Sequence, residues 1–341
     1  MKSQNNDNYP ELASIFFVNT KWAIFFKYVL KQPLRMFYFC FVPKIIRRKI
    51  SFKAELDRKA VLAQASKNFL ELYFKNKLSK FNLKPKKILT TDKIIWQYWG
   101  QGIDNILLPE TVKICFKSID IYKEDYQVIR LDDSTIGDYL DIPDFVWAKR
   151  KNKQFKFAFF SDLLRLALLD VYGGIWIDAT ILLTNPIPET IKKMNFFMFQ
   201  RDKNTPNKIF FEKYNNHYFG WNEHHHVNVL NSFIVSDKKG VIVHTLLDLL
   251  LNFWKTQDKV QHYFFFHIMV DELFKYEEYK KNNCPVFDDT LVHIIQSKMH
   301  ESFNPEEFEL IKQKTSIHKL TYVKKTKKNS YYEHIHNSYL G

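Results

Sequence analysis

Three charged side chains stand at spacings that suit chemistry on a phosphate-bearing substrate. Asp162 and Arg165 are three residues apart in the segment SDLLRLALLDVYGG, so a helix would place them on one face. Asp178 directly follows the apolar run Ile175–Ile177, and a carboxylate at a strand end projects into the ligand crevice of an α/β sheet. A carboxylate there can hold a hard divalent cation that bridges phosphates. The alternative for Asp162 and Arg165 is a surface ion pair that contributes little to stability.

The helix and the strand that must position these groups can be read from the same segment. The pattern predicts a helix with Ser161 as its N-cap that runs to Tyr172, where Gly173 and Gly174 end it. Residues 175–177 are then a short buried strand, because they are apolar and rich in β-formers.

A strand, a helix and a second strand are expected earlier in the chain. Residues 93–99 (KIIWQYW) and 126–131 (YQVIRL) read as strands, and Pro109 favours a helix over residues 109–120. This order indicates a βαβ unit with parallel strands and therefore an α/β fold. At least one of the aromatic residues Trp96, Tyr98 and Trp99 should pack in the core.

The combination of helix, paired glycines, aromatic strand and terminal aspartate resembles a known family. The block SDLLR…YGGIWIDAT is similar to the donor-binding core of retaining GT-A glycosyltransferases, and in particular of the capsular polysaccharide synthesis proteins. These proteins are related to the DXD-containing (family 32-like) sugar transferases. The resemblance covers roughly residues 90–320 and implies a GT-A domain, a Rossmann-like fold that binds a nucleotide sugar.

The resemblance also implies roles for individual residues. Asp162 and Arg165 match the pair that holds the sugar and phosphates of the nucleotide-sugar donor, and Trp99 falls near the aromatic residue that contacts the base. Asp178 matches the first carboxylate of the metal-binding DXD motif, whereas Thr180 occupies the place of the second. A divalent metal, Mn²⁺ or Mg²⁺, is therefore expected at Asp178 and Thr180, with one negative charge fewer than usual.

Two further segments are similar to site segments of the family. Asn231 and Ser232, on a strand predicted over residues 229–235, match residues that bind sugar hydroxyls, although Phe233 replaces a glycine. A strand-edge turn is the alternative for Asn231. His318 and Lys319 match a late pair that reaches the metal and the diphosphate, and a solvated tail is their alternative.

The remaining histidines and acids give weaker signals. Residues 224–226 are three consecutive histidines, which diverge too much to bind one metal, so an exposed loop is expected. His262 and His267 are expected in the core. Asp271 and Glu272 should lie on a helix, and Asp271 is the candidate that faces the acceptor.

The net charge of +14 is confined to one part of the chain. Residues 1–90 hold 19 Lys and Arg against 5 Asp and Glu, whereas the remainder carries equal numbers of both signs. A nucleic-acid enzyme usually carries its basic residues along its substrate groove, so no nucleic-acid partner is expected. Composition divides the chain into a basic helical extension (1–90), a GT-A domain (91–323) and a basic tail (324–341).

The extension alternates bulky apolar and basic residues from Lys21 to Lys49. Its longest uncharged run has eight residues, too few to span a bilayer. Pro33 should divide the helix there, and residues 53–78 form a second amphipathic helix. A basic helix with aromatic side chains suits the surface of an anionic membrane. The alternative is a helix packed on the protein's own core with its lysines directed outward.

These expectations combine into one function and one alternative. Three widely spaced cysteines indicate a reducing compartment. The expected activity is transfer of a hexose, with retention, from a UDP-linked donor to a lipid-linked saccharide in capsular or surface polysaccharide synthesis. The bacterial enzyme would lie on the inner face of the plasma membrane. The alternative is a non-catalytic carbohydrate- or partner-binding protein on the same fold.

Overall fold

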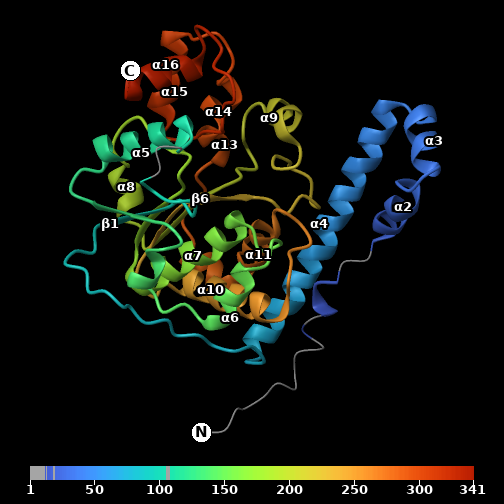
Figure 1. Ribbon diagram of the computed structural model, residues 1–341, viewed down its shortest axis with the longest axis horizontal. Coiled ribbons are helices and arrows are strands. Elements are labelled where there is room, and N and C mark those ends of the chain that lie inside the picture. The colour runs from blue at the N-terminus through green and yellow to red at the C-terminus, as the bar shows by residue number, and fades with distance from the viewer. Residues whose placement is uncertain (1–11, 13, 18–19, 105–107) are drawn as a thin grey trace. The chain divides into compact units, whose positions relative to one another are not determined.

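The computed structural model describes residues 12, 14–17, 20–104 and 108–341 (Figure 1). The chain divides into two compact units. The first contains residues 1–79, 207–228 and 252–277, and the second contains 80–206, 229–251 and 278–341. The observed division thus differs from a boundary at residue 90, because two later segments return to the first unit.

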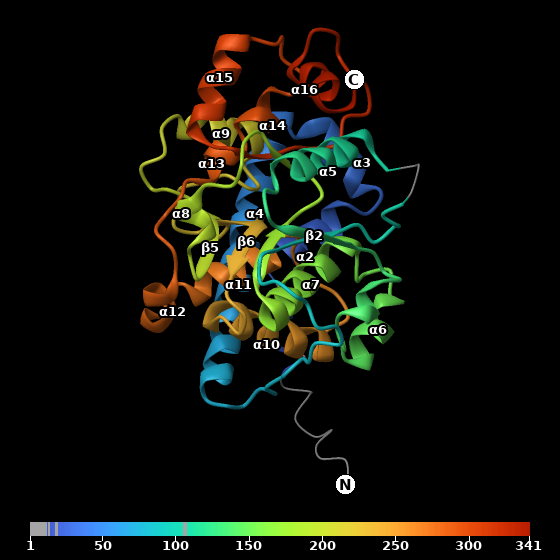
Figure 2. The same ribbon diagram turned by 90° about the vertical axis from the view of Figure 1, so that its left-hand side faces the viewer.

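A five-stranded sheet forms the centre of the second unit (Figure 2). The sheet order is β2-β1-β3-β6-β5, with bounds β1 (Ile94–Tyr98), β2 (Gln127–Leu131), β3 (Gly174–Ile177), β5 (Phe196–Gln200) and β6 (Val229–Ser236). β1 runs parallel to β2 and β3, which confirms the expected parallel pair, whereas β6 runs antiparallel to β3 and β5. The fold is therefore α/β with a mixed sheet. A separate antiparallel pair consists of β4 (Ile181–Leu183) and β7 (Ile317–Lys319).

The first strand is buried along its whole length because both faces of the sheet are covered. Trp96 is fully buried, and its indole Nε1 donates to the carbonyl of Gly173 at 2.9 Å. The crossover helix α5 (Glu110–Tyr122) starts after Pro109 and returns the chain to β2. Strand, helix and parallel strand thus form the predicted βαβ unit.

Helix α7 (Phe157–Tyr172) positions the charged pair of the second unit. Its N-cap is Lys156, so the prediction that Ser161 caps the helix was wrong, and Ser161 lies in the second turn. The helix ends at Gly173, whose φ of 75° belongs to the left-handed region that glycine adopts without strain. At Gly174 a Cβ atom would meet the carbonyl oxygen of Ile94 at 2.6 Å, so the close approach of β3 to β1 requires glycine.

Short helices complete the second unit. They are η1 (Ile136–Asp138), α6 (Asp144–Arg150), α8 (Glu189–Lys192), α13 (Asp289–Val292), α14 (Ile294–Lys298), α15 (Pro305–Lys314) and α16 (Tyr331–Leu340). Helix α16 lies beside α5 (Figure 2), and its Tyr331, Tyr332 and Ile335 are buried in a cluster with Ile114 of α5. The segment 324–341, expected as a basic tail, therefore ends in a packed helix, because its aromatic residues supply a buried face.

The first unit is helical over the described residues. Its helices are α2 (Lys21–Val29), α3 (Leu34–Phe41), α4 (Lys44–Phe74), α9 (Lys208–Asn215) and α11 (Phe265–Leu273). The interruption between α2 and α3 contains Pro33, as predicted. Helix α4 begins nine residues before the predicted start at residue 53. Helices α10 (Val241–Thr256) and α12 (Glu277–Asn282) cross the division between the units.

An aromatic core joins α4 and α11 in the first unit. The ring of Phe16 lies 5.0–5.3 Å from the rings of Phe69, Phe253 and Phe265, each in an edge-to-face arrangement. His262 and His267 are buried near this core, as predicted. These contacts fix the C-terminal half of α4.

Helices α2 and α3 differ from this core because neither contains a fully buried residue. They lie along the N-terminal half of α4 (Figure 1), and the indole Nε1 of Trp22 donates to Asp57 Oδ2 of α4 at 2.6 Å. None of the helices in the described part of the chain is both long and apolar enough to cross a membrane.

Candidate functional site

The turn after β3 carries the motif Asp178-Ala179-Thr180 and is fixed by backbone bonds to two strands. The N–H of Asp178 donates to the carbonyl of Ser232 on β6 at 2.8 Å, and the N–H of Ile181 closes the turn onto the carbonyl of Asp178 at 2.9 Å. The chain then enters β4, where Ile181 pairs with Lys319 of β7. Three strands therefore bring Asp178, Ser232 and Lys319 together, although Lys319 is 141 residues from Asp178.

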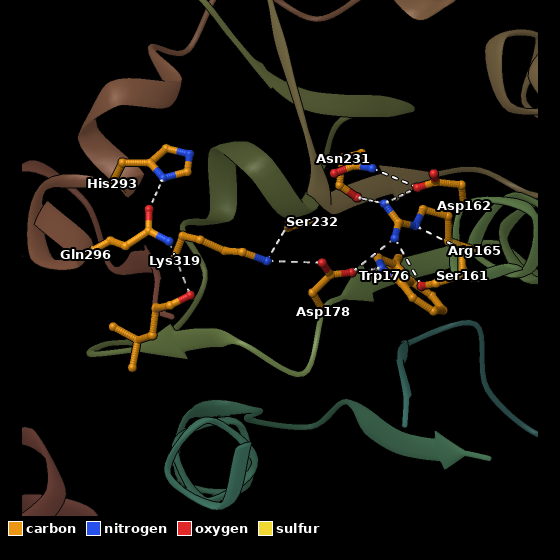
Figure 3. A network of polar contacts seen from close by, with 11 residues as sticks. Ser161, Asp162, Arg165, Trp176, Asp178, Asn231, Ser232, His293, Gln296 and Lys319 are labelled. Carbon is orange, nitrogen blue, oxygen red and sulfur yellow. Dashed lines mark hydrogen bonds and ion pairs between the residues drawn. The ribbon is translucent and has the colours of Figure 1, made fainter. Parts of the chain in front are cut away.

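Arg165 lies at the centre of the site and is 3% exposed (Figure 3). Its guanidinium donates to the carbonyl and hydroxyl oxygens of Ser161 at 3.1 and 3.0 Å and to the carbonyl of Asn231 at 2.6 Å. It also forms ion pairs with Asp162 at 3.2 Å and Asp178 at 3.4 Å. The predicted helical neighbours Asp162 and Arg165 are thus buried partners and not a solvated surface pair.

Asp162 is the carboxyl group with the largest upward shift of pKa in the site. Burial raises the pKa of Asp162 to about 7, and the negative charge of Asp178 acts in the same direction. The charge of Arg165 and a 2.8 Å hydrogen bond from Asn231 Nδ2 act against this rise. Asp162 therefore exchanges its proton near neutral pH.

Asp178 is affected in the opposite direction. Burial alone would raise the pKa of Asp178, but the charges of Lys319 and Arg165 and hydrogen bonds from Trp176 and Ser232 hold it below its ordinary value. Lys319 Nζ lies 3.1 Å from Asp178 Oδ2, and the indole Nε1 of Trp176 lies 2.8 Å from Oδ1. Asp178 is therefore ionised at neutral pH. The indole donor was not predicted from the sequence, because nothing in the run Ile-Trp-Ile shows that the ring folds back on the next residue but one.

Lys319 links the turn to β6. Its Nζ donates to Ser232 Oγ at 2.8 Å while it pairs with Asp178 (Figure 3). The structure thus brings the predicted residues Asn231, Ser232 and Lys319 to the same place as the aspartates. Asn231 does not make the strand-edge turn that was its alternative, because it lies within β6 and its side chain donates to Asp162.

Trp99 packs near the same turn, and Thr180 is part of it. Trp99 follows β1 and packs against a small cluster that includes Ala179 of the turn, and its ring lies 6.2 Å from that of Tyr322. The backbone carbonyl of Thr180 accepts from the N–H of Leu320 at 2.8 Å, and the residue is 9% exposed. Trp99 therefore borders the turn on which the metal was expected.

His318 does not join the site, although it precedes Lys319. Adjacent residues of a strand point to opposite faces, so Lys319 reaches Asp178 whereas His318 is fully buried and its Nε2 lies 3.1 Å from Thr184 Oγ1. Burial lowers the pKa of His318 to about 3. We therefore correct the expected metal ligands by removing His318, because it is packed inside the protein.

Asp271 belongs to the first unit and not to the second. Its carboxylate accepts from Asn228 Nδ2 at 2.8 Å and pairs with His226 and with Lys275, both at 3.4 Å. Burial would raise the pKa of Asp271, but His226, Lys275 and Asn228 together lower it. The role expected for Asp271, that it faces the acceptor, stays a prediction.

The three consecutive histidines are not one exposed loop. His224 is exposed, but His225 is 1% exposed and its Nε2 lies 2.7 Å from the carbonyl of Tyr218. His226 lies with Asp271 and Glu272 in the one group of at least three His, Cys, Asp or Glu side chains that could hold a metal among the described residues. Lys275 lies within ion-pair distance of both acids, so the group is already a balanced network.

The Asp178 turn offers a metal one carboxylate, and the residue in place of a second carboxylate is Thr180. Oxygen is the preferred ligand of Mg²⁺ and Mn²⁺, and Mg²⁺ is commonly held by one carboxylate together with substrate phosphates. The ionised Asp178 fits a cation that arrives with a diphosphate. It does not fit a cation held by protein ligands alone, because Lys319 and Arg165 already lie against its carboxylate.

Comparison with known proteins was made on sequence and on structure. The structure is similar to one described as "PaToxG Glycosyltransferase" at 15% identity, with a TM-score of 0.33, over 79% of this chain and 95% of that one. No curated protein matches the chain significantly. The family model described as "Capsular polysaccharide synthesis protein" matches residues 45–335, which include the whole Asp162–Lys319 site. The chain belongs to the capsular polysaccharide synthesis protein family.

Proposed function

We propose that the protein is a glycosyltransferase that moves a hexose from a nucleotide sugar, UDP-linked, to a lipid-linked saccharide in surface polysaccharide synthesis. One observation carries the proposal: Asp162, Arg165, Asp178 and Lys319 meet at the end of β3 with two cations held in fixed positions. Membership of the capsular polysaccharide synthesis protein family supports the assignment to surface polysaccharide synthesis.

The cations suit the leaving group of such a reaction. Negative charge grows on the diphosphate as the bond to the sugar breaks, and donors held in place stabilise that charge without reorganisation. Arg165 is held by Ser161 and Asn231, and Lys319 is held by Ser232, so both are oriented before the donor binds. Arg165 and Lys319 already pair with carboxylate oxygens. Their charges are therefore oriented to bind other anionic oxygens, such as those of a phosphate.

The polar groups of β6 and α7 suit the donor sugar. Asn231 and Asp162 share a hydrogen bond, and Asp162 exchanges its proton near neutral pH, so the pair can donate to or accept from sugar hydroxyls. In the proposed retaining reaction the acceptor hydroxyl attacks from the face that the leaving group vacates. We name no side chain as a covalent nucleophile.

A divalent cation would be held by Asp178 and Thr180 together with the diphosphate of the donor. Such an ion supplies positive charge that polarises the phosphate oxygens. The chain's own contribution is to keep Asp178 ionised through Lys319, Arg165 and Trp176.

We also propose that the first unit attaches the enzyme to the inner face of the plasma membrane. Bulky apolar side chains on α2, α3 and the first turn of α4 are 45–75% exposed. They include Ile24, Tyr28, Leu30, Leu34, Met36, Phe37, Phe39, Phe41 and Ile45. Basic residues alternate with them in the sequence, which suits an anionic lipid surface.

The transferase proposal is tested with a panel of nucleotide sugars, with Mn²⁺ or Mg²⁺ and with EDTA, by measuring the released nucleotide. We expect one or a few UDP-sugars to be hydrolysed or transferred by the wild-type protein. Asp178→Ala should reduce turnover by about 10²-fold or more, because it removes the group that orients both cations. Asp141→Ala, at an exposed residue of the same unit, is the control. Turnover that survives Asp178→Ala would show that the reaction occurs elsewhere.

A non-catalytic carbohydrate-binding protein is the second candidate. It is favoured by Thr180 in place of a second aspartate, which leaves the turn with one carboxylate. This candidate predicts that glycans bind without a nucleotide-sugar donor and that no donor is consumed. Calorimetry with purified glycans and with UDP distinguishes the transferase from the carbohydrate-binding protein, because only the transferase needs affinity for UDP.

A further inference from the structure

A groove in the first unit lies between the start of α4 and helix α9 with its following loop. It has a volume of about 950 Å³. The N-terminal part of α4 contributes Lys44, Arg47 and Arg48 to its lining, and the other wall contributes Lys213, Tyr214 and His217. All of these residues belong to the first unit, so the groove is independent of the Asp178 site.

The lining of the groove carries an excess of positive charge. Glu212 is its one acidic lining residue. Within the described part of the chain, none of Lys44, Arg47, Arg48 and Lys213 forms an ion pair. This contrasts with Lys59, deeper along α4, whose Nζ is buried and donates to the carbonyl of His217 at 2.6 Å. Such a concentration of unpaired cations attracts an anion, and arginine suits the oxygens of a phosphate group.

Arg47 connects the groove to a second, smaller hollow. Its guanidinium carbon lies 4.5 Å from the centre of the Phe39 ring, and its Nε is buried without a hydrogen-bond partner among the described residues. Phe39 in turn lines a hollow of about 480 Å³ with Met36 and Cys40 of α3. Gln32 and Arg35 complete the lining of this hollow. Phe39 therefore contacts Arg47 of the cationic groove and also lines the smaller hollow.

The surroundings of the groove indicate where its anion comes from. Phe41 and Ile45, next to the groove residues in the sequence, are 75% and 69% exposed. A free phosphate has no use for exposed aromatic and aliphatic side chains, whereas a lipid carries a phosphate and a hydrocarbon chain together. The groove volume also exceeds what one phosphate fills, so it can take a larger headgroup.

We propose that this groove binds the phosphate-bearing headgroup of a membrane lipid, while the hollow beside Phe39 takes the first part of the lipid's hydrocarbon chain. The site deepens the proposed membrane attachment and rests on it, but it does not depend on the transferase activity. The phosphate is bound by Arg47, Arg48 and Lys213. Because Arg47 stacks on Phe39, the phosphate site and the hydrocarbon site lie next to each other.

The test uses the full chain and a soluble, short-chain phosphatidic acid below its micelle concentration. A monomeric lipid has no surface potential, so calorimetry then reports binding to a site and not attraction to a charged surface. We expect Arg48→Glu with Lys213→Glu to weaken this binding by at least about tenfold, since each change removes a cationic donor to the phosphate and adds a carboxylate that repels it.

Two controls make the result specific. The double change Lys49→Glu with Lys53→Glu reverses the same amount of charge on α4 outside the groove, and it should alter the affinity less than about twofold. Inorganic phosphate should bind the wild-type protein at least about tenfold more weakly than the lipid, because it lacks the chain. Equal losses in the two double variants would overturn the site, and equal affinity for inorganic phosphate would overturn the lipid source.

Further measurements separate this site from the proposed function. Binding of UDP should be the same in the wild-type protein and in both double variants, because the Asp178 site belongs to the other unit. If UDP binds and the short-chain lipid does not, the groove assignment alone fails. If the wild-type protein also fails to float with vesicles that contain phosphatidic acid, the membrane attachment fails as well, and the transferase proposal stands.

Discussion

The two charged regions of the molecule are built on opposite principles. Around Asp178, two carboxylates and two cations share hydrogen bonds in a largely buried cluster, and the pKa values of the two acids move in opposite directions. On the first unit, three of the groove's cations (Lys44, Arg48 and Lys213) are exposed and Arg47 is partly buried. None of the four has an acidic partner among the described residues. The buried charges therefore depend on one another, and the exposed charges act separately.

This difference teaches what each region can do. Coupled, buried charges are fixed to within a hydrogen-bond length, which is what transition-state stabilisation requires. Separate, exposed charges attract a ligand over a distance and are screened by salt. We therefore expect single changes in the cluster to have large and non-additive effects, and changes on the first unit to have small and additive ones.

Removal of the central cation should have the largest effect. Arg165→Met leaves Asp162 and Asp178 without their shared partner, and breaking a buried pair in this way costs about 3–5 kcal/mol of unfolding free energy. Urea denaturation measures the loss. Lys93→Met removes an exposed pair with Asp125 and should leave the denaturation midpoint unchanged. Similar midpoints for both variants would contradict the coupling that we infer.

Loss of the second cation should affect binding more than stability. Lys319→Met should weaken UDP binding by about 10–100-fold, because a hydrogen bond to a charged group contributes about 1.5–3 kcal/mol. Isothermal calorimetry measures the affinity. Lys312→Met, on α15, is the matched control because Lys312 pairs with Glu309 and not with Asp178. If both changes weaken UDP binding equally, Lys319 acts only through net charge.

The exposed face should respond in smaller, additive steps. Ile24→Ser on α2 and Phe41→Ser on α3 each remove an exposed apolar side chain, and together they should reduce binding to anionic vesicles about tenfold or more. Flotation measures the bound fraction. Ile88→Ser, at a residue of the second unit that is 94% exposed, is the control. If the double variant loses more or less vesicle binding than the two single variants combined, Ile24 and Phe41 are coupled, which contradicts the additivity that we expect.

The last expected effect is a change in how stability depends on pH. The pKa of Asp162 is raised to about 7 in the folded state, so the folded protein binds this proton more tightly than the unfolded chain. Stability should therefore fall as the pH rises from the unfolded value of about 4 towards 7. Asp162→Asn removes this dependence, so its Tm relative to wild type should rise across that interval.

Asp178→Asn is the matched comparison for the pH measurement. The pKa of Asp178 is lowered, so its contribution to stability is present above its unfolded pKa and is lost as the pH falls. The two variants should thus differ in the direction of their pH dependence. Parallel curves would show that the two aspartates experience the same environment, which contradicts the arrangement described above.

The local part of the site could be predicted from the sequence. Asp162 and Arg165 share a helix face because they are three residues apart, and Asp178 ends a strand because the apolar run stops there. The βαβ order was predicted for the same reason: each element is defined by its own residues. Asn231 and Lys319 meet these groups as the family resemblance implied, and no local pattern specifies that meeting.

The remaining part depends on register and on long-range packing. A strand of three residues gives no alternation pattern, so nothing in the sequence shows that Lys319 faces Asp178 while His318 faces the core. Asp271 was expected near the acceptor because an acidic pair on a helix suggests chemistry. The contacts of α11 with α4 place it in the first unit, and no composition signal at residues 252–277 indicates that return of the chain.

The length of α4 has a mechanical consequence. A continuous helix of 31 residues rises about 46 Å, and its buried side chains run from Ala54 to Tyr73 while Lys44, Arg47 and Arg48 lie ahead of them. The C-terminal part of the helix is therefore fixed by its buried contacts, and its N-terminal part extends from them as a rigid rod that carries the groove residues. A ligand in the groove is therefore held at a fixed distance from the buried part of α4. A Gly-Gly or Pro insertion near Ser51 would make the helix bend there, so this distance would vary.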